Sequence, residues 1–148
     1  YDYFSSLYGV DNLVREERKE KLFKKFGIDK FKEVKIGDLS TGMKQKVSIV
    51  ISLVHNPDFI IFDEPTNGLD VITAKVVTDY LIELKNEGKT ILLSTHIFSL
   101  VEKICDRVGI IINGKMIVSE KIETLIKDKS LEETFFDIYV KELGDKNE

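Results

Sequence analysis

The fold is set by residues 59–70, which read FIIFDEPTNGLD. The apolar run 59–62 is typical of a strand buried on both faces of a parallel sheet. Asp63 and Glu64 follow it, at the strand end where open α/β sheets bind ligands. One carboxylate can hold Mg²⁺ on phosphate oxygens through water, and the other can orient or deprotonate an attacking water. The alternative is an exposed surface pair, and the PTNGLD that follows favours the functional interpretation.

A second motif lies upstream, where residues 39–45 read LSTGMKQ. Ser40 is placed to cap a helix that continues to about His55, with apolar residues along one face. A helix start offers free N–H groups to an anion, and Gly42 lets the backbone approach it closely. The alternative is an ordinary N-cap, and the spacing does not identify the anion.

His96 follows another apolar run, TILLS at residues 90–94, which we also interpret as a strand buried on both faces. If this strand neighbours the 59–62 strand, His96 and Glu64 open onto one crevice. An imidazole there can donate a hydrogen bond to a terminal phosphate. A lone histidine is more often an ordinary polar residue, and we interpret His55, at a helix end, in that way.

The remaining pattern predicts helices, one hairpin and a capping box. Residues 1–37 are predicted to be largely helical, with Gly27 as a left-handed helix cap. Asn113-Gly114 predicts a tight hairpin turn, and Ser130 with Glu133 predicts a capping box. Further helices are predicted at 71–85, 98–105, 122–128 and 131–143, with a polar tail at 144–148. This order predicts the α/β class, a mostly parallel sheet with an antiparallel hairpin at one edge.

Composition indicates a soluble globular protein of one domain or part of one. The chain has 148 residues, a net charge of −4 and 43% apolar residues, with both signs of charge interspersed. That balance argues against a nucleic-acid partner. Cys105 is the only cysteine, which fits a reducing compartment, and no apolar run approaches the ~20 residues of a membrane span. The chain begins at Tyr1 without Met, so we expect the natural N-terminus to lie elsewhere.

These residues together resemble the ATP-binding-cassette (ABC) ATPases. Residues 39–43 resemble the family signature, usually written LSGGQ, and residues 59–63 resemble the Walker B strand. Glu64 then matches the catalytic glutamate, residues 68–70 the D-loop and His96 the switch histidine. The form STGMKQKV resembles cassettes that serve ABC-2-type exporters of sodium, drugs or polysaccharides.

The resemblance implies a partial P-loop NTPase fold with three parts. These are a helical signature subdomain at 1–57, an α/β core at 58–121, and C-terminal helices and tail at 122–148. It also implies ATP and Mg²⁺ as cofactors, with two subunits sandwiching two nucleotides.

The resemblance also assigns roles to single residues. In this interpretation the signature contacts the γ-phosphate of a nucleotide held by the other subunit. The implied signature contacts are Ser40, Thr41, Gly42 and Met43. Asp63 would hold Mg²⁺, Glu64 would polarise the attacking water, His96 would contact the γ-phosphate, and Asp70 would carry communication across the dimer.

The sequence departs from the family pattern in two ways. Thr41 and Met43 stand where the family usually has Gly and Gln. No G-x-x-x-x-G-K-[ST] loop occurs in the chain, and we expect that loop, the adenine-stacking aromatic residue and the glutamine loop upstream of Tyr1. The isolated chain is therefore expected neither to bind ATP tightly nor to hydrolyse it. An open sheet edge would let it self-associate.

The expected partners are a second ATPase subunit and transmembrane permease subunits, at the cytoplasmic face of the cell membrane. Two alternatives stay open. A non-transport ABC-class ATPase of the chromosome type would need a long heptad arm, for which residues 1–37 are too short. A non-catalytic interaction module would not need both Glu64 and His96.

Overall fold

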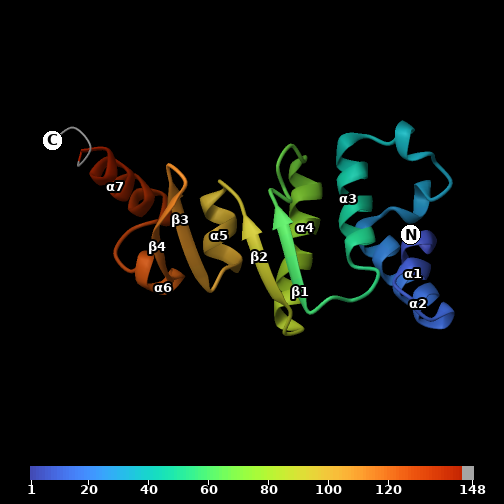
Figure 1. Cartoon of the computed structure of the whole chain (residues 1–148). Coiled ribbons are helices and arrows are strands. Elements are labelled where there is room, and N and C mark those ends of the chain that lie inside the picture. The colour runs from blue at the N-terminus through green and yellow to red at the C-terminus, as the bar shows by residue number, and fades with distance from the viewer. Residues whose placement is uncertain (145–148) are drawn as a thin grey trace. The chain divides into compact units, whose positions relative to one another are not determined.

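The structure, a computed structural model, describes residues 1–144 and forms two compact units (Figure 1). The first unit is Tyr1–Ser94, and the second begins at Thr95. Each is described by itself. The three-part division at residues 57 and 121 stays a prediction, and the expected tail lies largely outside the described residues.

The first unit begins with short helices, as the sequence predicts. They are α1 (Asp2–Leu7), α2 (Asn12–Phe26) and two 3₁₀ turns, η1 (Asp29–Phe31) and η2 (Ile36–Asp38). Asp11 caps α2 by accepting from the Leu13 N–H at 2.8 Å. Gly27 ends it with φ +63°, which confirms the predicted left-handed cap.

Helix α2 is tied to α4 (Val71–Asn86) by aromatic packing. Phe26 is 1% exposed and meets the Tyr80 ring edge-on, with the centroids 5.1 Å apart. Lys25 lies over the same ring, 5.0 Å from its centroid, and pairs with Glu83. Burial raises the pKa of Tyr80 to about 12, so this phenol stays neutral at any physiological pH.

Helix α3 (Thr41–Ser52) carries the signature residues at its start and ends before the expected His55. The helix ends at Ser52 with Leu53 as its C-cap, and Asn56 after it adopts φ +51°, a conformation that asparagine tolerates better than most residues. His55 stacks on Tyr8 with ring centroids 4.1 Å apart, a packing role that agrees with its interpretation as structural.

Strands β1 (Phe59–Asp63) and β2 (Thr90–Ser94) pair in parallel, with Phe59 opposite Thr90 and Asp63 opposite Ser94. Helix α4 joins them as the crossover that a parallel pair requires, and it runs behind the two strands in Figure 1. Ile60 and Phe62 are buried on one face of β1.

The prediction that both strands are buried on two faces is wrong for this chain. Phe59 is 56% exposed, Ile61 65% and Leu92 56%, and all three alternate with buried or half-buried neighbours. The apolar residues of these strands could be buried on both faces of the sheet, but residues 1–144 cover only one of the two faces. These three residues are called the bare sheet face below.

The second unit contains α5 (Phe98–Ile104), the hairpin β3 (Arg107–Ile112) and β4 (Lys115–Lys121), α6 (Ile122–Leu125) and α7 (Leu131–Gly144). The predicted turn is confirmed by positive φ at Asn113 and Gly114, +50° and +75°. The hairpin forms its own two-stranded sheet. The predicted capping box is confirmed, because the Ser130 N–H and hydroxyl each lie 2.9 Å from the Glu133 carboxylate.

One helix offers a matched pair of valines for testing the core. Val77 is 2% exposed and Val71 is 86% exposed, both in α4. We expect Val77→Ala to lower the free energy of unfolding by about 2 kcal/mol through lost burial and a residual cavity. Val71→Ala should change it by less than about 0.5 kcal/mol. Urea unfolding of the 148-residue chain measures both, and equal effects would contradict the assigned core.

Candidate functional site

Two acidic residues stand at the carboxyl end of β1, as predicted. Asp63 is exposed, and its carboxylate accepts a short hydrogen bond from the Ser94 hydroxyl at the matching position of β2. The Glu64 N–H donates to the Ser94 carbonyl at 2.9 Å, which continues the parallel ladder one residue past β1. Ser94 therefore fixes both acidic residues, one through its side chain and the other through its backbone.

Glu64 leaves the strand in a left-handed conformation, with φ +45°. A non-glycine residue rarely adopts this conformation, which costs about 1–2 kcal/mol. The neighbouring structure holds it: the Asn67 N–H closes a turn onto the Glu64 carbonyl at 3.1 Å, and Pro65 is under 2% exposed. Strain of this kind concentrates at functional sites, where it aims a side chain that an extended strand would direct elsewhere.

The start of α3 has the geometry of an anion site. The Ser40 oxygen accepts from the Met43 N–H at 3.3 Å, so Ser40 caps the helix while its hydroxyl proton can still donate. The amides of Thr41 and Gly42 belong to the first turn, which has no intrahelical acceptor for them. These donors and the positive helix end favour an anion there.

The loop after Glu64 lies against this helix start. A β-carbon placed on Gly42 would come 3.8 Å from Leu69 Cδ2 and 3.9 Å from Asp70 Oδ2. Gln45, one turn further along α3, donates from Nε2 to the Pro65 carbonyl at 3.3 Å. The signature residues and the acidic strand end are therefore packed together within one unit.

Asp70 ends this loop and begins α4. Its carboxylate accepts from the Thr73 N–H at 3.0 Å, and this backbone hydrogen bond lowers the pKa of Asp70. The residue is exposed and anionic at neutral pH, next to Gly42. An added anion at the start of α3 would meet this charge unless a cation or a second hydrogen-bond donor accompanied it.

His96 is placed differently from the other predicted site residues. It is exposed and belongs to the second unit, two residues after the end of β2. Its chain position past a strand parallel to β1 agrees with the expected order of the motifs. Its juxtaposition with Glu64 stays a prediction.

The chain was compared with known proteins. Residues 3–67 match the family model described as "ABC transporter". The chain is 40% identical over 131 residues to the ABC transporter ATP-binding protein NatA of Bacillus subtilis, covering 88% of this chain and 53% of NatA. It is 34% identical over 146 residues to the bacitracin transport ATP-binding protein BcrA of Enterococcus faecalis, covering 92% and 47%.

A solved structure described as the ATP binding subunit of an ABC transporter superposes with a TM-score of 0.86 at 29% identity. The match covers 93% of this chain and 60% of that one. The chain belongs to the ABC transporter ATP-binding family. It has the fold of an ABC ATPase in part, since it spans about half the length of the curated relatives it matches.

In this ABC chain, the structure adds to the candidate site two residues that the sequence did not predict. Ser94 contacts Asp63, and Gln45 contacts the Pro65 carbonyl. The signal for Ser94 was present, because two parallel strands that each end in a polar residue bring those residues side by side. Gln45 had no comparable signal, since its acceptor is a backbone atom twenty residues away.

The acidic pair fits Mg²⁺ held through phosphate and water rather than in an all-protein cage. Across the described residues, no three His, Cys, Asp or Glu side chains gather closely enough to hold a metal ion. Asp63 offers an exposed carboxylate already oriented by Ser94, and Mg²⁺ in nucleotide sites uses one or two such carboxylates. Among the same residues, no helix combines the length and apolar character needed to cross a bilayer.

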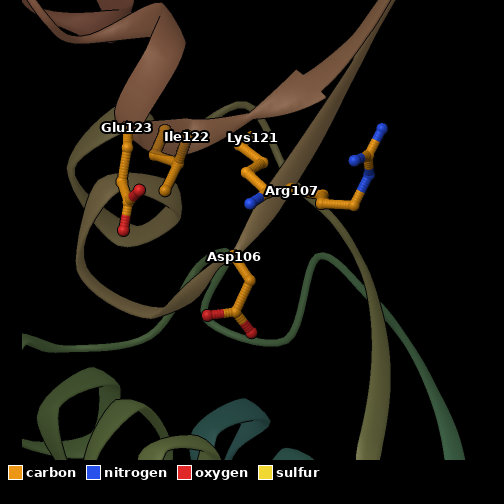
Figure 2. A pocket seen from close by; sticks show the side chains of 5 residues that line it. All are labelled: Asp106, Arg107, Lys121, Ile122 and Glu123. Carbon is orange, nitrogen blue, oxygen red and sulfur yellow. The ribbon is translucent and has the colours of Figure 1, made fainter.

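A depression of about 360 Å³ in the second unit lies apart from these motifs in the chain. Figure 2 shows its lining side chains, with Arg107 extending away from Glu123. It is lined by Asp106, Arg107, Lys121, Ile122 and Glu123. Two acidic and two basic side chains give it no net charge with which to select a ligand, and two of its lining residues bond to each other, since the Ile122 N–H donates to the Asp106 carbonyl at 3.0 Å.

The strain at Glu64 can be measured. Glycine adopts positive φ without a steric cost, so Glu64→Gly should raise the free energy of unfolding of the chain by up to about 1 kcal/mol. Asn56→Gly is the matched control, because asparagine already tolerates its φ of +51°. Chemical denaturation should give a smaller gain for Asn56→Gly, and a loss of stability in Glu64→Gly would show that its backbone is not strained.

Proposed function

We propose that this chain is part of an ATP-hydrolysing subunit of a membrane exporter. The observation that carries the proposal is the packing of the Gly42 turn against the loop that begins at Glu64, with Glu64 bonded across the strand ends. An anion-binding helix start and an acidic strand end thus share one rigid region. The names of the relatives, which include a bacitracin transport protein, support export.

Bound ATP with Mg²⁺ would supply the phosphoanhydride and the metal charge. In this proposal a second subunit holds most of the nucleotide. Its phosphate oxygens accept hydrogen bonds from the Ser40 hydroxyl and from the Thr41 and Gly42 amides, and Met43 lies beside these donors. Asp63 would hold the metal ion. Glu64 orients the attacking water and accepts its proton.

Two further residues complete the proposed site. His96 donates a hydrogen bond to the terminal phosphate, and Asp70 transmits the state of one nucleotide site to the other. Positioning and charge stabilisation then carry the reaction, as in other phosphoryl transfers. The subunit works with a second copy and with transmembrane permease subunits, at the cytoplasmic face of the membrane; the solved relative described as a subunit of a transporter supports this assembly.

Glu64→Gln in the complete subunit tests this function. It keeps the size of the side chain and removes the base, so we expect ATP hydrolysis to fall at least about a hundredfold while ATP-dependent dimerisation persists or strengthens. Phosphate release and light scattering with ATP and Mg²⁺ measure the two effects.

Glu87→Gln is the matched control, because Glu87 is exposed at the end of α4 and pairs with Lys21 at 3.9 Å; neither readout should move. The isolated 148-residue chain, without the Walker A loop, should show no micromolar affinity for ATP in a filter assay. If the complete wild-type subunit neither hydrolyses ATP nor dimerises in its presence, a non-catalytic interaction module would be the better-supported function.

The bare sheet face gives the isolated chain a way to self-associate. In the described residues β1 and β2 pair only with each other, so both have an open edge beside exposed Phe59, Ile61 and Leu92. We expect concentration-dependent dimers or larger species in light scattering, reduced by Ile61→Lys. Ile72→Lys is the control, since Ile72 is 78% exposed on α4. If light scattering shows only monomer at high concentration, this proposal is wrong.

A further inference from the structure

Helix α3 is joined to the loop that follows Glu64 by a hydrogen bond from the Gln45 side chain. Its Nε2 donates to the Pro65 carbonyl at 3.3 Å, and Gln45 is itself half-buried. Lys44, the preceding residue on the helix, makes a bond of equal length to the Gly37 carbonyl at the surface. The two bonds are alike in length, but they tie α3 to different segments.

The Pro65 carbonyl needs such a partner. Pro65 is under 2% exposed and Thr66 is 6% exposed, so this part of the loop is largely removed from water. A buried backbone carbonyl without a hydrogen bond costs free energy comparable to a lost hydrogen bond. The loop's own bonds are two turn contacts, Asn67 N–H to Glu64 at 3.1 Å and Leu69 N–H to Thr66 at 3.4 Å, and neither uses the Pro65 carbonyl.

The position of this carbonyl links it to Glu64. Pro65 directly follows the residue with φ +45°, a conformation that persists only where the surroundings hold it. The Gln45 bond fixes the next peptide, and at the far end of the loop Leu69 and Asp70 lie within 4 Å of the place that a β-carbon on Gly42 would take. Helix α3 therefore bonds to the start of the loop 65–70 and lies close to its end.

We propose that Gln45 is a positioning residue that makes the anion-binding start of α3 and the Glu64 carboxylate move as one body. The inference rests on the proposed function, in which these two groups serve different nucleotides. A shift of α3 on binding phosphate at one site then changes the aim of Glu64 at the other. Gln45 touches neither nucleotide in this scheme and acts through the Pro65 carbonyl.

The test compares three variants of the complete subunit. Gln45→Leu keeps the volume and removes the donor; Gln45→Lys keeps a donor of similar reach. Ser52→Ala removes a hydrogen bond internal to α3, from the Ser52 hydroxyl to the Ile49 carbonyl at 2.7 Å, and controls for general loss of helix stability.

We expect Gln45→Leu to lower kcat about tenfold because Glu64 is aimed less well, a change in barrier similar in size to one hydrogen bond, with KM for ATP within about twofold of wild type. The Hill coefficient for ATP should fall toward one. Gln45→Lys should recover most of kcat, and Ser52→Ala should resemble wild type. A kcat in Gln45→Leu equal to wild type, a similar loss in Ser52→Ala, or no recovery in Gln45→Lys would overturn the proposal.

A second readout separates this proposal from the proposed function. In the 148-residue chain, hydrogen exchange at the Asn67 and Leu69 amides should accelerate in Gln45→Leu and not in Ser52→Ala. A wild-type subunit without ATPase activity would refute the proposed function, and the exchange rates would still decide whether Gln45 holds the loop. Unchanged exchange in Gln45→Leu would refute the positioning role even if the ATPase activity is confirmed.

Discussion

The parallel register of β1 and β2 is the constraint on which the candidate site depends. With Asp63 opposite Ser94, the Ser94 hydroxyl reaches the Asp63 carboxylate and its carbonyl reaches the Glu64 amide. A slip of one residue would exchange the buried and exposed faces of each strand and break both contacts. The strand pairing that accompanies the burial of Ile60 and Phe62 therefore also aims the acidic pair, so packing and chemistry are set by the same register.

Local signals in this chain are reliable where a single residue type meets a single backbone requirement. Gly27 and the Asn113-Gly114 turn adopt the positive φ that their sequence predicts, and Ser130 with Glu133 forms the capping box. The double burial predicted for the strands is wrong because burial depends on neighbours outside the segment. An apolar strand such as 59–62 can be buried on both faces, and whether both faces are covered depends on the rest of the polypeptide.

The site divides in the same way between what the sequence can predict and what it cannot. The order of the signature, the acidic pair and the D-loop predicted the family, because family membership depends on residue types at fixed separations along the chain. The role of Ser94 could be inferred only once the parallel pairing of the two strands is assumed, and that of Gln45 depends on a backbone acceptor, which residue types do not encode. The left-handed Glu64 is a third example, since nothing about glutamate predicts positive φ; the turn onto Asn67 imposes it.

The two sheets differ in how far apart along the chain their strands lie. The hairpin strands are joined by two residues and can meet within microseconds. The strands of the parallel pair are separated by all of α4, so β1 emerges from the ribosome about thirty residues before β2 is complete. At roughly 5–20 residues per second, translation leaves β1 without its β2 partner for roughly 2–6 s. Until β2 has been synthesised, a nascent chain therefore exposes the hydrogen-bonding edge of β1 that later pairs with β2.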